Sequence, residues 1–110
     1  MFSSISGTSE SAPFGFVMLS TIKYGTNGTT YPRLRWHQTA DYGYVPNKKM
    51  LNTFMATAVD TYDEETAIHP RYKKIVGERL AYAGLNVAYG LKEFPANGPL
   101  APTIFVSKDD

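Results

Sequence analysis

Two short apolar runs stand out along this chain of 110 residues. FGFVMLS runs from Phe14 to Ser20, and TFMATAVD runs from Thr53 to Asp60. Each run is bounded by turn-forming or charged residues, a pattern typical of strands that are buried on both faces. We therefore predict two strands of this kind.

One amphipathic helix is predicted between Pro70 and Tyr89. Its apolar residues recur every three or four positions, whereas most of its charged residues fall on the opposite side. Pro70 suits a first helical turn, and Gly90 suits the position just beyond the last one. This is the clearest helix in the sequence.

A shorter helix is predicted to start at Pro32, again because proline fits a first turn. It lies between a glycine-containing loop at residues 23–30 and a stop at Gly43 and Pro46. Its apolar face would be formed by Leu34, Trp36 and Ala40.

The predicted order is strand, helix, strand, helix. Two buried strands joined by a helix favour a parallel pair with a right-handed crossover, and thus an α/β fold. Residues 1–12 are predicted to form a flexible leader, and residues 13–92 read as the end of a larger α/β domain. Residues 93–110 are predicted as a Pro/Gly linker with a last strand, TIFV, at Thr103–Val106. A partial parallel sheet leaves strand edges uncovered, so the isolated chain is expected to be poorly soluble.

Composition narrows the range of functions. The chain is 43% hydrophobic and carries a net charge of +1 with scattered basic residues, which disfavours nucleic acid as a partner. No apolar run is long enough to span a membrane, and the first residues do not form a secretory signal. The absence of cysteine excludes a thiol nucleophile and thiolate metal sites. Two distant histidines do not predict a metal site, and no cofactor is expected.

Chemistry is expected in the loop that follows the second strand, because ligands of open parallel sheets bind beyond the carboxyl ends of the strands. A carboxylate bound to one imidazole nitrogen allows the other nitrogen to take a proton from a serine hydroxyl. The pattern also fits an ordinary surface histidine behind acidic residues that favour a helix N-terminus, which is the commoner case. The loop contains His69 together with Asp60, Asp63, Glu64 and Glu65.

The segment IHPRYKKIVGERLAYAGLNVAYG, from Ile68 to Gly90, resembles the C-terminal motif of the sialate O-acetylesterase family. The resemblance extends over PFGFVMLS, RLRWHQTADYGYVPNKKMLNTFMATAVD and NGPLAPTIFVS, so that it covers nearly everything from Pro13 to Ser107. It implies the C-terminal part of a serine esterase on a flavodoxin-like, three-layer αβα fold of the SGNH type. The implied substrate is an acetyl ester on O-acetylated sialic acid or a sialoglycoconjugate.

The resemblance also implies roles for residues of the loop. His69 matches the histidine of the family and would be the general base. Asp63 would be its acidic partner, with Glu65 as the alternative.

Arg35 and Gln38 match a recurring Arg-x-x-Gln pattern of the family. They are interpreted either as a pair on the helix surface or as substrate-binding groups, with the Arg35 guanidinium meeting the carboxylate of the sugar. His37 lies between them and is interpreted as structural.

The Gly-Gln-Ser-Asn type of block that carries the serine of the family has no counterpart in these 110 residues. Because ester cleavage needs a nucleophile and oxyanion donors, the isolated chain is expected to be inactive and to need the N-terminal part of the domain. The alternatives are a non-catalytic sugar-binding module and an inactive remnant. For the intact family enzyme the resemblance implies a lysosomal or secreted location.

Overall fold

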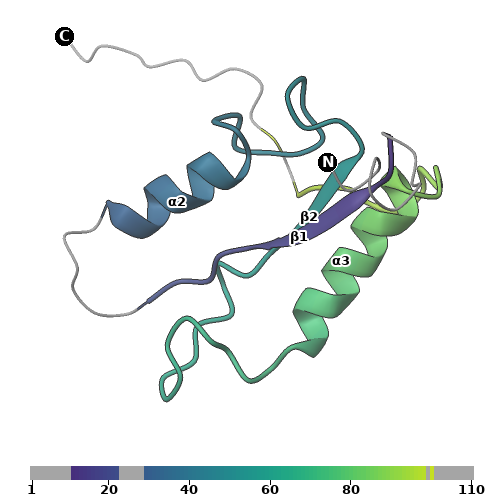
Figure 1. Cartoon of the computed structure of the whole chain (residues 1–110). Coiled ribbons are helices and arrows are strands. Elements are labelled where there is room, and N and C mark those ends of the chain that lie inside the picture. The colour runs from purple at the N-terminus through teal and green to yellow at the C-terminus, as the bar shows by residue number, and fades with distance from the viewer. Residues whose placement is uncertain (1–10, 23–28, 99, 101–110) are drawn as a thin grey trace, which may run out of the picture.

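The structure is a computed structural model, and it describes residues 11–22, 29–98 and 100. Its elements, in chain order, are strand β1 (Phe14–Met18), helix α2 (Thr30–Gln38), strand β2 (Thr53–Thr57) and helix α3 (Lys74–Val87) (Figure 1). This order of strand, helix, strand and helix is the predicted one.

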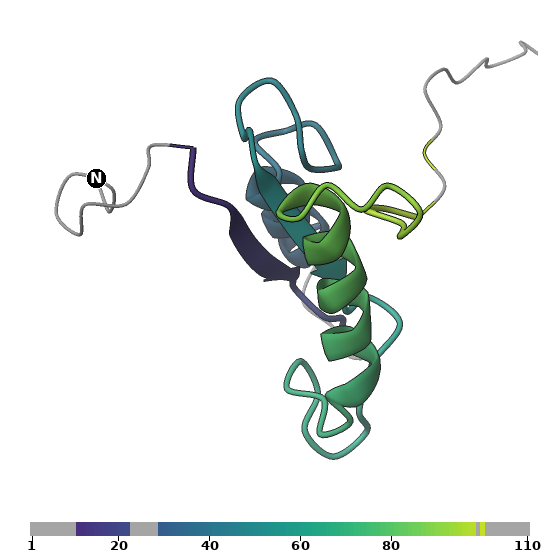
Figure 2. The same cartoon turned by 90° about the vertical axis from the view of Figure 1, so that its right-hand side faces the viewer.

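The two strands pair in parallel, with Phe14 opposite Thr53 and Met18 opposite Thr57. Helices α2 and α3 lie on opposite sides of the strands (Figures 1 and 2). Parallel neighbours need a long crossover connection, which here contains α2. The predicted α/β fold with parallel strands is therefore confirmed, and the arrangement is compatible with part of a three-layer αβα domain.

The core of the described chain lies between β2 and α3. Ala56 and Ala58 are buried against Val76, and Ile75 and Leu80 pack around them. The apolar positions of α3 recur along one helical face, so the helix can lay that face on the strand. This packing fixes both ends of the loop that joins β2 to α3.

Phe54 connects three of the four elements. It lies opposite Gly15 in the ladder, and its ring also faces Gly84 on α3. A β-carbon at Gly15 would lie 2.3 Å from the ring, and one at Gly84 would lie 3.2 Å from it. Both glycines therefore make room for the ring of Phe54.

The prediction that both strands are buried on both faces is wrong for β1. Phe14 is 59% exposed and Val17 is 43% exposed. The cause is the position of the helices, since α3 packs mainly on β2 and α2 contributes no buried residue.

Both helices are shorter than predicted. Helix α3 begins at Lys74 rather than Pro70, because Arg71 folds back onto the preceding loop instead of starting a helical turn. Helix α2 ends at Gln38, since Ala40 and Asp41 have positive φ angles of 53° and 68°.

The predicted apolar face of α2 is not packed in the described chain. Leu34 is 48% exposed and Trp36 is 49% exposed. Most of the predicted loop at residues 23–30, nearly all of the leader and the predicted strand at Thr103–Val106 lie outside the described residues.

Asn47 organises the connection from α2 to β2. Its amide nitrogen donates to the carbonyl oxygens of Thr39 and Tyr44, and its Oδ1 accepts from the N–H groups of Lys49 and Met50. Asn47 is buried, and these four bonds use the full capacity of its side chain. The connection is therefore a defined structure.

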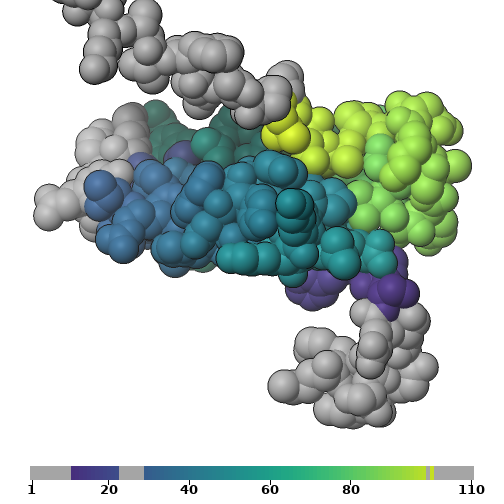
Figure 3. Space-filling view, turned by 90° about the horizontal axis from the view of Figure 1, so that it is seen from above, coloured from purple at the N-terminus to yellow at the C-terminus, as the bar shows by residue number. Residues whose placement is uncertain are grey.

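The segment after α3 lies beside this connection (Figure 3). The amide nitrogen of Asn97 donates to the carbonyl oxygen of Val45 over 2.9 Å. Val45 itself is fully buried, so the contact closes the described fold on the side of α2.

Replacing Gly15 with alanine is expected to lower the free energy of unfolding by about 1–3 kcal/mol, the usual effect of overpacking. The Phe54 ring cannot yield easily, because Gly84 lies against it as well. Chemical denaturation of the purified protein measures the change. Gly77→Ala is the control, because a β-carbon there meets nothing within 4 Å. It should raise stability by up to about 1 kcal/mol through helix propensity. Equal stability of Gly15→Ala and the parent would contradict the packing of Phe54.

Candidate active site

The first half of the β2–α3 loop is anchored by Arg79 of α3. Its guanidinium donates to the carbonyl oxygen of Thr57 over 2.9 Å and to both carboxylate oxygens of Asp60 over 2.6 Å each. The hydrogen bond from Arg79 is the main cause that lowers the pKa of Asp60. Asp60 therefore belongs to the loop anchor in this structure.

Asp63 is the centre of the second half of the loop. Its carboxylate accepts hydrogen bonds from the N–H groups of Glu65 and Arg71, at 3.0 and 3.1 Å. It also accepts from Nε and Nη2 of Arg71, at 2.9 and 3.2 Å. The Arg71 side chain and these backbone N–H groups hold the pKa of Asp63 well below its usual range. Arg71 binds Glu65 as well, at 2.7 Å.

His69 lies in the turn that these bonds close. Its N–H donates to the carbonyl oxygen of Thr66 over 3.0 Å, and the Thr66 hydroxyl donates to the carbonyl oxygen of His69 over 2.5 Å. The residue is exposed, and its imidazole forms no hydrogen bond with Asp63 or Glu65 in the described structure. The structure therefore places the three predicted residues on one loop, with the carboxylates bound to Arg71.

A histidine–carboxylate contact does occur at the end of α2. Nδ1 of His37 lies 2.5 Å from Oδ1 of Asp41, and both side chains are more than half exposed. The contact depends on the positive φ of Asp41, which turns the chain just after the helix. The sequence spacing of four residues is compatible with such a pair but does not show the turn.

Gln38 attaches α2 to the outer edge of β1. Its amide nitrogen donates to the carbonyl oxygen of Val17 over 3.2 Å, and its Oε1 accepts from the N–H of Leu19 over 2.9 Å. The neighbouring residues Phe14 and Met18 use their backbone groups toward β2, so Val17 and Leu19 face the opposite edge. The Gln38 side chain thus makes the two bonds that an adjacent parallel strand would make.

Arg35 continues this attachment at the carboxyl end of β1. Its Nη1 donates to the carbonyl oxygen of Ser20 over 3.2 Å. The Ser20 hydroxyl lies 3.5 Å from that of Thr61, which is in the β2–α3 loop. The structure therefore brings Arg35 and Gln38 together, and it places them at the same end of the sheet as the loop of His69.

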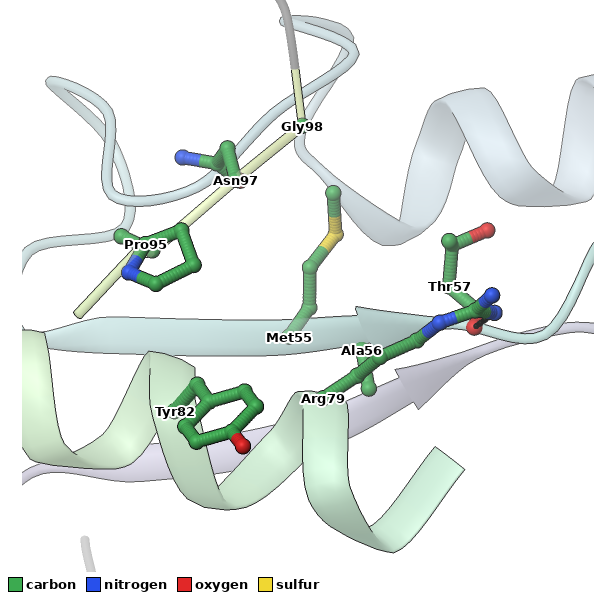
Figure 4. Close-up of a pocket in the computed structure, with 9 residues that line it drawn as sticks. Met55, Ala56, Thr57, Arg79, Tyr82, Pro95, Asn97 and Gly98 are labelled. Carbon is green, nitrogen blue, oxygen red and sulfur yellow. Dashed lines mark hydrogen bonds between the residues drawn. The ribbon is translucent and has the colours of Figure 1, made fainter. Parts of the chain in front are cut away.

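A pocket of about 540 Å³ lies beside β2 (Figure 4). Met55 enters it from the strand, Arg79 and Tyr82 from α3, and Pro95 and Asn97 from the segment after the helix. Its walls include neither His69 nor Asp63, so we do not assign it to the predicted chemistry. Within the described residues, no three histidine or acidic side chains gather to hold a metal ion.

Sequence reasoning did not single out Arg71 and Arg79, the two cations that hold the loop. Arg71 lies three residues before α3 and Arg79 in its second turn, 8 and 19 positions after their carboxylates, and only an acidic loop followed by basic residues could have pointed to the two pairs. None of the helices in the described part of the chain is long and apolar enough to cross a bilayer.

No protein-family model matches the chain. Several curated proteins are nevertheless similar to it over most of its length. In particular, it is 48% identical to a sialate O-acetylesterase of Mus musculus, 47% identical to that of Homo sapiens and 48% identical to that of Rattus norvegicus, each over 96 residues. The predicted resemblance to the sialate O-acetylesterases is therefore confirmed.

These alignments cover 84% of the chain but only 18% of each relative. The chain thus spans less than a fifth of the length of the curated relatives that it matches.

Gln38→Ala is expected to lower the free energy of unfolding by about 1–2 kcal/mol, since two hydrogen bonds of about 0.5–1.5 kcal/mol each are lost. Gln38→Glu is the matched variant, because it keeps the acceptor for Leu19 but sets a carboxylate oxygen against the Val17 carbonyl. It should be destabilised at pH 7 and recover below about pH 4, where glutamate is protonated. Denaturation at both pH values is the measurement. Parent-like stability of Gln38→Glu at pH 7 would contradict the bond to Val17.

The lowered pKa of Asp63 makes the stability of the loop depend on pH. The folded state binds the proton more weakly than the unfolded state, so the contribution of Asp63 is complete above about pH 5 and is lost as the pH falls further. We expect Asp63→Asn to be less stable than the parent at pH 7, with a difference that shrinks between about pH 5 and pH 2. Salt should reduce the difference, since Arg71 is 62% exposed. A difference independent of pH in denaturation experiments would contradict the ion pair.

Proposed function

We propose that this chain supplies the catalytic histidine, His69, of a sialate O-acetylesterase. The observation that supports the proposal best is the position of His69. It lies on an exposed loop beyond the carboxyl end of a parallel strand, in a chain that is 47–48% identical to such enzymes over 84% of its length. Loops at this end of a parallel sheet are where α/β proteins bind their ligands.

In the proposed reaction, a serine from the rest of the domain attacks the acetyl carbonyl carbon. The neutral imidazole of His69 accepts the serine proton as the new C–O bond forms. When the tetrahedral intermediate collapses, the bond to the sugar oxygen breaks and the imidazolium returns the proton to that oxygen. The products of this half-reaction are the sugar hydroxyl and an acetyl-serine.

The second half-reaction repeats these steps with water. His69 takes a proton from the water as it attacks the acetyl-serine, and the proton then passes to the serine oxygen while acetate leaves. Asp63, the predicted acidic partner, lies on the same loop and shapes the turn that carries His69. Oxyanion donors, like the serine, would come from the rest of the domain.

Arg35 is proposed to meet the carboxylate of the sialic acid. Its Nη1 binds the Ser20 carbonyl, whereas its other guanidinium nitrogens form no hydrogen bond within the described residues. A guanidinium that is held at one nitrogen can still present a second one to a carboxylate. Gln38 would support this role by keeping α2 on the edge of β1.

His69→Ala in the full-length protein is expected to lower kcat by at least about 100-fold, the usual contribution of a general base. Acetate release from an O-acetylated sialic acid is the measurement, with thermal unfolding as a check of the fold. His37→Ala is the matched control, because His37 and its carboxylate partner Asp41 lie at the end of α2 and not on the loop of His69. It should turn over like the parent.

Near-normal acetate release by His69→Ala would overturn the assignment. A parent protein that binds sialic acid but releases no acetate would instead favour the non-catalytic sugar-binding alternative.

A further inference from the structure

The turn that carries His69 is closed by a single carboxylate. One oxygen of Asp63 receives the N–H of Glu65, and the other receives the N–H of Arg71. These two N–H groups bracket the turn between residues 66 and 69. The Asp63 carboxylate therefore sets the distance between the two ends of the turn.

Arg71 holds this carboxylate in place. Its guanidinium binds both oxygens of Asp63, and Nη1 binds Glu65 on the other side at 2.7 Å. A planar guanidinium gives such a two-point contact a fixed geometry, which a lysine cannot reproduce. The Asp63 side chain is only 13% exposed, so its orientation is well defined.

The turn needs this restraint because its backbone is not in a relaxed conformation. Ala67 has a φ of 52°, a left-handed value that side chains other than glycine adopt unfavourably. The N–H of Ala67 donates to the carbonyl oxygen of Asp63 over 2.8 Å. The bonds of Asp63 therefore hold together a turn that would otherwise relax.

We propose that Arg71 is a positioning residue for His69, which acts by clamping Asp63 and Glu65 and so fixing the turn. Asp63 then serves the histidine through the backbone of the loop and not by contact with the ring. Pro70, the single residue between His69 and Arg71, is buried, so the clamp is transmitted over a short and anchored link. The inference rests on the proposed role of His69.

The test compares Arg71→Gln and Arg71→Lys with the parent in the full-length protein. Arg71→Gln is expected to lower kcat by about 10- to 100-fold with little change in KM, since small displacements of a reacting group have effects of this size. Hydrogen exchange of the amides between residues 64 and 69 should become faster in the same variant. Arg71→Lys keeps the charge but loses the two-point contact. Its kcat and its exchange rates should therefore lie between those of the parent and those of Arg71→Gln.

Lys74→Gln is the control for the loss of a positive charge near the loop. Lys74 pairs with Glu78 on α3 and has no bond to the loop, so this variant should match the parent in both measurements. Parent-like kcat in Arg71→Gln would overturn the inference. An equal loss of kcat in Arg71→Gln and Lys74→Gln, with parent-like kcat in Arg71→Lys, would overturn it too, because loss of charge alone would then be the cause.

The two measurements keep this inference separate from the assignment of His69. If His69→Ala retains its activity, the proposed function fails, whereas the exchange rates in Arg71→Gln still report whether the clamp orders the turn. Unchanged exchange rates would overturn the clamp itself, whatever the activity.

Discussion

The ring of Phe54, placed between two glycines, is the contact on which the other parts of the described fold depend. Gly15 permits β1 to run beside β2, and Gly84 permits α3 to approach the sheet at the same point. The small side chains of Ala56 and Ala58 continue this close approach toward the carboxyl end of β2. Because strand and helix are held so near to each other, the loop between them has fixed ends.

Two arginines then order that loop through charge. Arg79 binds its beginning at Asp60, and Arg71 binds its later part at Asp63 and Glu65. Exposed ion pairs of this kind contribute little to global stability. Their effect here is on geometry. The Arg79 guanidinium also binds the backbone carbonyl of Thr57, and the backbone N–H of Arg71 binds the same carboxylate as its side chain. His69 is therefore presented on an exposed but well-organised turn.

Much of the fold could be predicted from local patterns, and the exceptions have physical causes. The apolar runs at β1 and β2 and the periodicity of α3 reflect packing within the chain. The burial of β1 could not be predicted, because it depends on what covers Phe14 and Val17. The early end of α2 depends on backbone angles at Ala40 and Asp41, which residue type does not fix.

The candidate site, too, could be predicted only in part. Its location follows from strand order, so the loop with His69 was predicted. The partner of Asp63 depends on side-chain geometry that spacing does not encode, and Arg71 was overlooked. The resemblance to the sialate O-acetylesterases is confirmed by the curated relatives, whereas the roles of His69, Asp63, Arg35 and Gln38 stay predictions. The side chain of Gln38 also limits how the sheet can grow. A further strand on the outer edge of β1 could pair near Gly15 but could not use the Val17 carbonyl or the Leu19 N–H, because Gln38 already occupies both, so the outer edge of β1 is open to another strand only along its first half.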